Sequence, residues 1–189
     1  MKLWLIAVLL GLAGAGVHGY GLLKPAEFGA ALRRFPRSMA WGYILMPLAT
    51  IWFLYNLKTD DIADFDAFKP VLFIGFAVVG FGACAFVRDF LAVRGLSVLA
   101  LLFAKLVLDA ARVVDTPWRL VLVVWAYLCV ILGVWFTISP WRMRDLIMVA
   151  TANERRVRIT SAVRCTLSLF LIILGLTVFR ESGALAGTP

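Results

Sequence analysis

Six runs of mostly apolar residues, each about 20 residues long, dominate this chain of 189 residues. A helix needs about 20 such residues to cross the hydrocarbon core of a bilayer. Because 63% of the residues are hydrophobic and only 16% are charged, this surface cannot be hidden in one soluble core. The sequence therefore predicts an all-α, polytopic transmembrane helix bundle that forms one domain over residues 1–189. The expected spans are 3–23, 39–57, 71–87, 93–113, 120–139 and 160–179.

The distribution of basic residues predicts an orientation for these spans. If all six cross the membrane, 11 of the 19 Lys and Arg residues lie in or beside the loops 24–38, 88–92 and 140–159, against six on the opposite side. Cytoplasmic loops are the ones enriched in Lys and Arg. We therefore expect both termini outside the cytoplasm of a bacterial-type inner membrane. A cleaved signal peptide at the first run would reverse this bias, so we expect that run to be a span.

The net charge of +8 is interpreted as membrane topology, and we expect no nucleic-acid partner. The expected partners are membrane lipids, together with other membrane subunits or a second copy of the chain. We expect an interfacial cytoplasmic helix around 140–158. Tryptophan favours the headgroup level, and arginine reaches lipid phosphate. The predicted headgroup anchors are Trp118, Arg119, Trp141, Arg142, Arg155, Arg156 and Arg158.

Three charged residues lie in or beside the fourth run. Lys105, Asp109 and Arg112 are spaced i, i+4 and i+7, which places them on one helix face. With a span over 93–113, Lys105 lies close to the middle of the bilayer, where a charge costs roughly 2.5–3.5 kcal/mol on insertion scales. These residues form a candidate polar intramembrane site. The alternative is a self-neutralising pair that stabilises the bundle.

An acidic segment follows the second run. Asp60, Asp61 and Asp64 match the D-D-x-x-D pattern, and the segment resembles the motif with which prenyl-transferring enzymes hold magnesium and diphosphate. That resemblance implies a metal site, because Mg²⁺ prefers carboxylate oxygens. The alternative is a solvated acidic turn, since the second acidic motif of those enzymes is absent from the sequence. We expect no cofactor, because His18 is the only histidine and no C-x-x-C pair is present.

Small residues recur every four positions in the first run. Gly11, Ala15 and Gly19 form small-xxx-small steps, which allow two membrane helices to approach closely. The partner helix belongs either to this chain or to another subunit, and the sequence favours neither.

The C-terminal third resembles a known family. Its fifth run, the Ser139-Pro140-Trp141-Arg142 segment and Arg164 are similar to the small two-helix inner-membrane proteins of the YjeT type. That family has no established activity, so the resemblance implies a fold alone.

The sequence favours a non-catalytic accessory or scaffold subunit of a membrane complex, since it contains no nucleophile group or ligand set that could support catalysis. One alternative is a small transporter or lipid-handling protein that uses Lys105 and Asp109. A second alternative is a metal-dependent membrane enzyme that acts on lipid.

Overall fold

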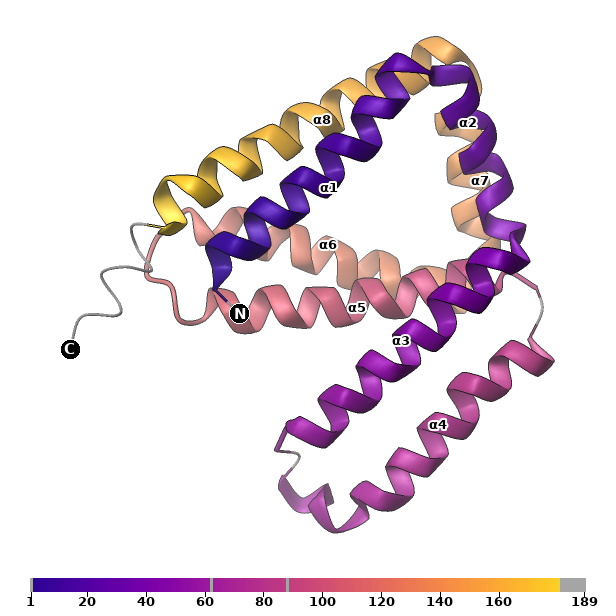
Figure 1. Ribbon diagram of the computed structural model, residues 1–189, viewed down its shortest axis with the longest axis vertical. Helices are drawn as coiled ribbons and strands as arrows, with labels where there is room; N and C mark the ends of the chain where they lie inside the picture. The colour runs from indigo at the N-terminus through magenta and orange to yellow at the C-terminus, as the bar shows by residue number, and fades with distance from the viewer. Residues whose placement is uncertain (1, 62, 88, 181–189) are drawn as a thin grey trace. The chain divides into compact units, whose positions relative to one another are not determined.

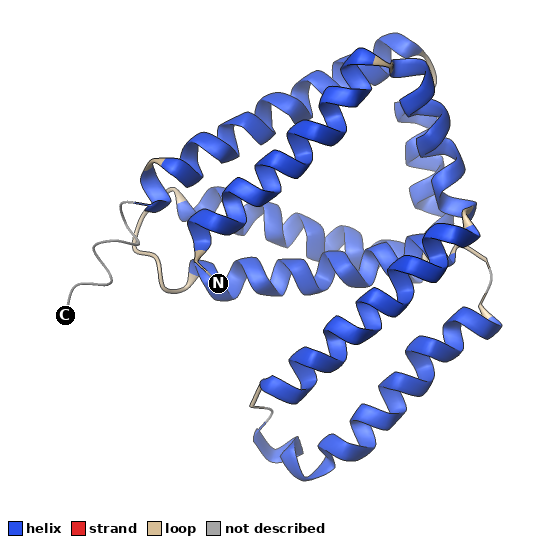
Figure 2. Cartoon of the chain, viewed as in Figure 1, coloured by secondary structure: helices blue, strands red, loops and turns tan. Residues whose placement is uncertain are grey.

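The computed structural model describes residues 2–61, 63–87 and 89–180, and these residues form helices and short connections without any strand (Figure 2). Six of the described helices are long and apolar enough to cross a membrane. The prediction of an all-α, multi-pass membrane protein is therefore confirmed. In chain order the elements are α1 (Leu3–Leu23), α2 (Pro25–Arg34), the 3-10 helix η1 (Phe35–Arg37), α3 (Met39–Thr59), the 3-10 helix η2 (Ala63–Phe68), α4 (Lys69–Phe86), α5 (Leu91–Ala111), α6 (Arg119–Ile138), α7 (Pro140–Ala150) and α8 (Glu154–Leu176).

The region around 140–158 differs from the single interfacial helix that the sequence predicts. Helix α7 ends at Ala150, and α8 begins at Glu154, six residues before the expected start of the last span. The break has a local cause, because the Asn153 side chain accepts a hydrogen bond of 2.8 Å from the backbone N–H of Arg156. Backbone N–H groups in the first turn of a helix lack partners within the helix. The Asn153 side chain supplies one, so a new helix starts after this residue.

Helix α2 differs from the prediction, because residues 24–38 carry four basic residues and the sequence predicts a loop there. Its first residue is Pro25, whose fixed φ suits the first position of a helix. Glu27 lies in the first turn and interacts favourably with the helix dipole there.

Contacts divide the chain into two compact units, which are described separately. The first comprises Met1–Arg33, Phe103–Val130 and Asp145–Pro189, and the second comprises Arg34–Leu102 and Ile131–Arg144.

In the first unit, α1 and α8 lie side by side and antiparallel (Figure 1). Buried apolar side chains at the start of α1 and the end of α8 join those of α5 and α6 in one core. Examples are Leu3, Ile6, Leu174, Val107 and Leu122.

Glycines bring α1 and α8 into close contact. A Cβ atom added to Gly11 would lie 2.5 Å from Cγ1 of Ile172 and 2.7 Å from the carbonyl oxygen of Ser168. At Gly14 it would overlap the Ser168 hydroxyl. The backbones therefore approach each other as small-residue helix pairs do in membranes. Two more glycines in close contact across this pair are Gly21, against Ser161, and Gly175, against Val8.

In the second unit, α3 lies antiparallel to α4. Gly80 of α4 is packed directly against Thr50, and the rings of Phe53 and Phe76 meet edge to face with centroids 4.7 Å apart. The N-terminal half of α5 packs on α3 through Gly95, where an added Cβ would lie 2.7 Å from the backbone nitrogen of Met46. Close backbone approach at a glycine therefore recurs in both units.

We expect Gly11→Leu to destabilise the fold by about 1–3 kcal/mol, because the new side chain would overpack the α1–α8 contact. The matched control is Gly16→Leu on the same helix, since an added Cβ at Gly16 meets nothing within 4 Å. Thermal unfolding of both variants in the same detergent measures the difference. Equal stability of the two variants would contradict the described packing.

Candidate functional site

Lys105 and Asp109 form an ion pair on α5, with 2.7 Å between the lysine Nζ and the carboxylate Oδ2. Their side chains are 42% and 44% exposed. Because α5 ends at Ala111, Lys105 lies six residues from the end of the helix, which is roughly 9 Å along its axis. The pair therefore occupies the last two turns of α5, closer to the helix end than a span over 93–113 implies.

Arg112 follows the last residue of α5, and Arg119 is the first residue of α6. Both side chains line one open hollow of about 410 Å³ in the first unit. The remaining wall is mostly apolar and comes from Leu108, Ala111, Leu120, Val123 and Tyr127. Arg112 is predicted to belong to the polar intramembrane site, and Arg119 is predicted to be a headgroup anchor. The structure brings these two arginines together at one hollow.

Contacts within the first unit position Arg119 at the start of α6. The Arg119 guanidinium donates through Nη1 to the carbonyl oxygen of Val114 at 2.9 Å, and its backbone N–H donates to Thr116 O at 3.2 Å. Trp118 packs its ring edge-on against Phe170 of α8, with centroids 6.4 Å apart. These contacts hold Arg119 at the rim of the hollow.

Other arginines also donate to carbonyl oxygens near helix ends. Arg33 donates to Thr151 O at 2.7 Å, just past the end of α7, and Arg156 donates to Val149 O at 3.3 Å. Arg94 donates to Thr137 O at 3.1 Å in the last turn of α6. The last carbonyl groups of a helix lack intrahelical partners and carry partial negative charge, so each guanidinium stabilises a helix end.

The remaining predicted anchors lie on the surface. Trp141 is 47% exposed, and Arg142, Arg155 and Arg158 are exposed as well. Their role as lipid anchors stays a prediction.

The predicted metal site is only partly described. Asp60 ends α3 as its C-terminal cap, and Asp61 follows it, while the side chain of Asp64 lies outside the described residues. Within the described part of the chain, no group of three His, Cys, Asp or Glu side chains is arranged to hold a metal. His18 contacts the ring of Phe28 edge-on, with centroids 6.3 Å apart. The metal site at the three aspartates stays a prediction.

The predicted packing residues of α1 lie in different surroundings. Gly11 is buried against α8, Ala15 is partly buried, and an added Cβ at Gly19 would meet nothing within 4 Å. Gly21 and Gly175, which also lie in close contact across the α1–α8 pair, were not predicted as packing residues. Those two could be found only with knowledge of which helices pair.

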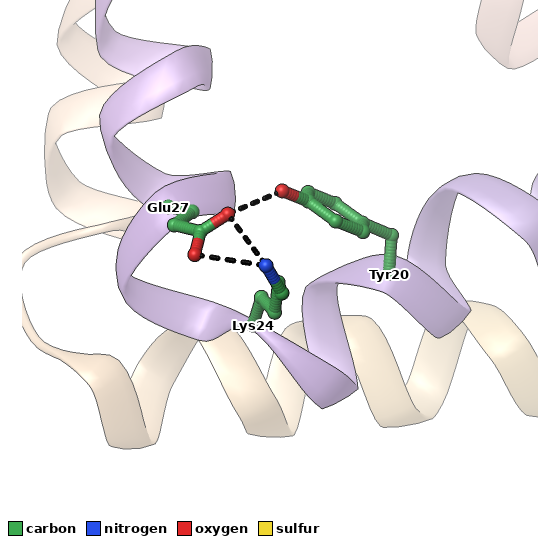
Figure 3. A network of polar contacts seen from close by, with 3 residues as sticks. All are labelled: Tyr20, Lys24 and Glu27. Atoms are coloured by element: carbon green, nitrogen blue, oxygen red, sulfur yellow. Dashed lines mark hydrogen bonds and ion pairs between the residues drawn. The ribbon is translucent and has the colours of Figure 1, made fainter.

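A polar network joins the end of α1 to α2 (Figure 3). The Tyr20 hydroxyl donates to Oε2 of Glu27 at 2.7 Å, and Lys24 Nζ donates to Oε1 at 3.1 Å. The hydrogen bond from Tyr20, and next that from Lys24, hold the pKa of Glu27 below its ordinary value. The same carboxylate raises the pKa of Lys24. The network links the last turn of α1 to the first turn of α2.

Comparisons of the chain with protein-family models, curated protein sequences and solved structures find no match. The resemblance of the C-terminal third to YjeT-type proteins therefore stays a prediction.

We expect the network's contribution to stability to be present above pH 4.5, the ordinary pKa of the Glu27 carboxyl, and to be lost as the pH falls through its lowered pKa. Tyr20→Phe removes the strongest of the hydrogen bonds and should raise the Glu27 pKa toward 4.5. Carbon-13 NMR titration of labelled glutamate in nanodiscs measures this pKa.

The control for this titration is Tyr43→Phe, which removes the hydroxyl of an exposed tyrosine elsewhere on the chain. It should leave the Glu27 pKa unchanged. A Glu27 pKa that is the same in wild type and in Tyr20→Phe would contradict the described network.

Proposed function

We propose that this multi-pass membrane protein is a non-catalytic accessory or scaffold subunit of a complex in a bacterial-type inner membrane. The observation that carries the proposal is the surface of α4. In the most apolar 18-residue window of this span, only 6% of the residues are buried inside the chain. One face of α4 packs on α3 through Gly80, and most of its other described residues are exposed.

The free surface of α4 carries two glycines of its own. Gly75 and Gly82 are seven residues apart, so they lie on one helix face, roughly 140–160° around the helix from Gly80. An added Cβ at Gly75 meets nothing within 4 Å, and at Gly82 it meets only the ring of Phe86 at 4.0 Å. Glycines on an outer face of a membrane helix allow a second helix to approach closely. This face fits a helix of a partner subunit.

The transporter alternative is less well supported by the same molecule. Its proposed site, Lys105 and Asp109, is a self-neutralising pair in the last two turns of α5. At roughly 9 Å from the helix end, the long side chain of Lys105 can extend to the membrane interface. The cost of placing its charge in the membrane is therefore met without a bound substrate.

The proposed orientation places the basic loops in the cytoplasm. It rests on the 11 basic residues expected on one side against six on the other. The hydrogen bond of 2.7 Å from Arg33 to Thr151 O supports it, because this bond joins two of the basic segments, 24–38 and 140–159. Two segments in direct contact outside the spans belong on one side of the membrane.

Native mass spectrometry of the protein, mildly extracted from its host membrane, tests the proposal. We expect it to elute with other subunits at fixed stoichiometry. Gly75→Leu with Gly82→Leu should abolish that association and leave the chain folded, because the two side chains block the face that the partner helix approaches.

The control is Gly16→Leu, which adds the same bulk at an open glycine of α1. It should retain the association. The proposal is wrong if the wild-type protein appears without any partner, or if the α4 double variant and the control associate equally well.

A further inference from the structure

We infer that the hollow lined by Arg112 and Arg119 is a binding site for an anionic phospholipid, whose phosphate lies between the two guanidiniums and whose acyl chain lies along α6. This inference goes beyond the proposed subunit role and does not depend on it.

The charges at the rim of the hollow favour an anion. Neither Arg112 nor Arg119 has a carboxylate within ion-pair distance among the residues that the structure describes. Asp109 and Asp115 are the acidic residues closest to Arg112 along the chain. Asp109 is engaged by Lys105 at 2.7 Å, and Asp115 is not among the residues that line the hollow. Guanidinium groups bind phosphate oxygens through paired hydrogen bonds, and two of them on one rim match a single phosphate group.

The two arginines are prepared for binding in different ways. Arg119 uses one N–H for Val114 O at 2.9 Å, which leaves the other donors of its guanidinium for a ligand in a fixed position. The Arg112 side chain is exposed, so it can close over a bound headgroup. Because the Arg119 guanidinium is already held in place, less conformational entropy is lost when it binds a ligand. The exposed Arg112 side chain adds further contacts to the headgroup.

The rest of the wall favours a lipid over a free phosphate ion. Leu120 and Val123 continue the hollow along α6, and Tyr127 lies eight residues beyond Arg119, which is roughly 12 Å along the helix axis. This length of apolar wall suits the upper part of an acyl chain, and an inorganic phosphate would leave it uncovered. A ligand with an anionic head and an apolar body satisfies both parts.

The test uses the delipidated full chain in detergent, with phosphatidylglycerol or phosphatidylcholine of identical acyl chains added back. Native mass spectrometry counts the lipids that remain bound. We expect wild type to retain phosphatidylglycerol in preference to phosphatidylcholine. Arg112→Ala with Arg119→Ala should weaken phosphatidylglycerol binding by about tenfold or more, as expected when charged hydrogen bonds are lost.

The control is Lys2→Ala with Lys58→Ala, which removes the same charge from exposed lysines that lie outside the hollow and are not among the predicted headgroup anchors. It should bind phosphatidylglycerol as wild type does. A third variant, Val123→Phe, fills the hollow, keeps every charge and should also lose the lipid. Arg112→Ala alone separates binding from folding, because the Arg112 side chain has no hydrogen bond or ion pair within the described part of the chain.

Three results would overturn the inference. The first is a loss of lipid in the control as large as in the arginine double variant, which would indicate general charge attraction. The second is unchanged binding in Val123→Phe and Arg112→Ala. The third is displacement of phosphatidylglycerol by millimolar inorganic phosphate, which would show a site for the free ion instead of the lipid.

Discussion

The antiparallel contact between α1 and α8 holds the first and last spans of the first unit together. Gly11 and Gly14 lie against Ser168, and Gly175 lies against Val8, so the two backbones pack at a distance that larger side chains would prevent. In a bilayer the hydrophobic effect does not drive helices together, because lipid tails are as apolar as leucine. Close van der Waals contact between small residues is therefore what selects this pairing, and the core with α5 and α6 forms beside it.

Arginine supplies the second constraint, at the ends of the helices. Arg33, Arg94, Arg119 and Arg156 each donate to a carbonyl oxygen near a helix end. The basic residues that give the chain its charge of +8 thus have structural roles besides their expected attraction to lipid headgroups. At the rim of the hollow, Arg119 donates to the carbonyl oxygen of Val114, whereas the exposed Arg112 side chain has no hydrogen bond or ion pair among the residues that the structure describes.

The sequence predicts the helical class and the six long apolar helices, because a span is decided by local composition alone. It does not predict α2, because ten residues with mixed polarity carry only a weak signal. It also misses the break between α7 and α8, which depends on the Asn153 side chain accepting from Arg156. The hollow could not be predicted because Leu108 and Val123, which both line it, come from different helices. Their proximity depends on tertiary packing, which no spacing along the chain reveals.

The claim that six helices cross the membrane with the basic loops on the cytoplasmic side is tested most directly by thiol labelling of intact cells. Cys84, Cys129 and Cys165 are first replaced by alanine. Single variants Arg34→Cys and Asp115→Cys, both at exposed positions, are then treated with a membrane-impermeant maleimide. We expect labelling of the Asp115→Cys variant in intact cells and of the Arg34→Cys variant only after lysis. Labelling of both variants from the same side would contradict complete crossings by all three of the helices between them, α3, α4 and α5, and labelling of the Arg34→Cys variant from outside would contradict the orientation.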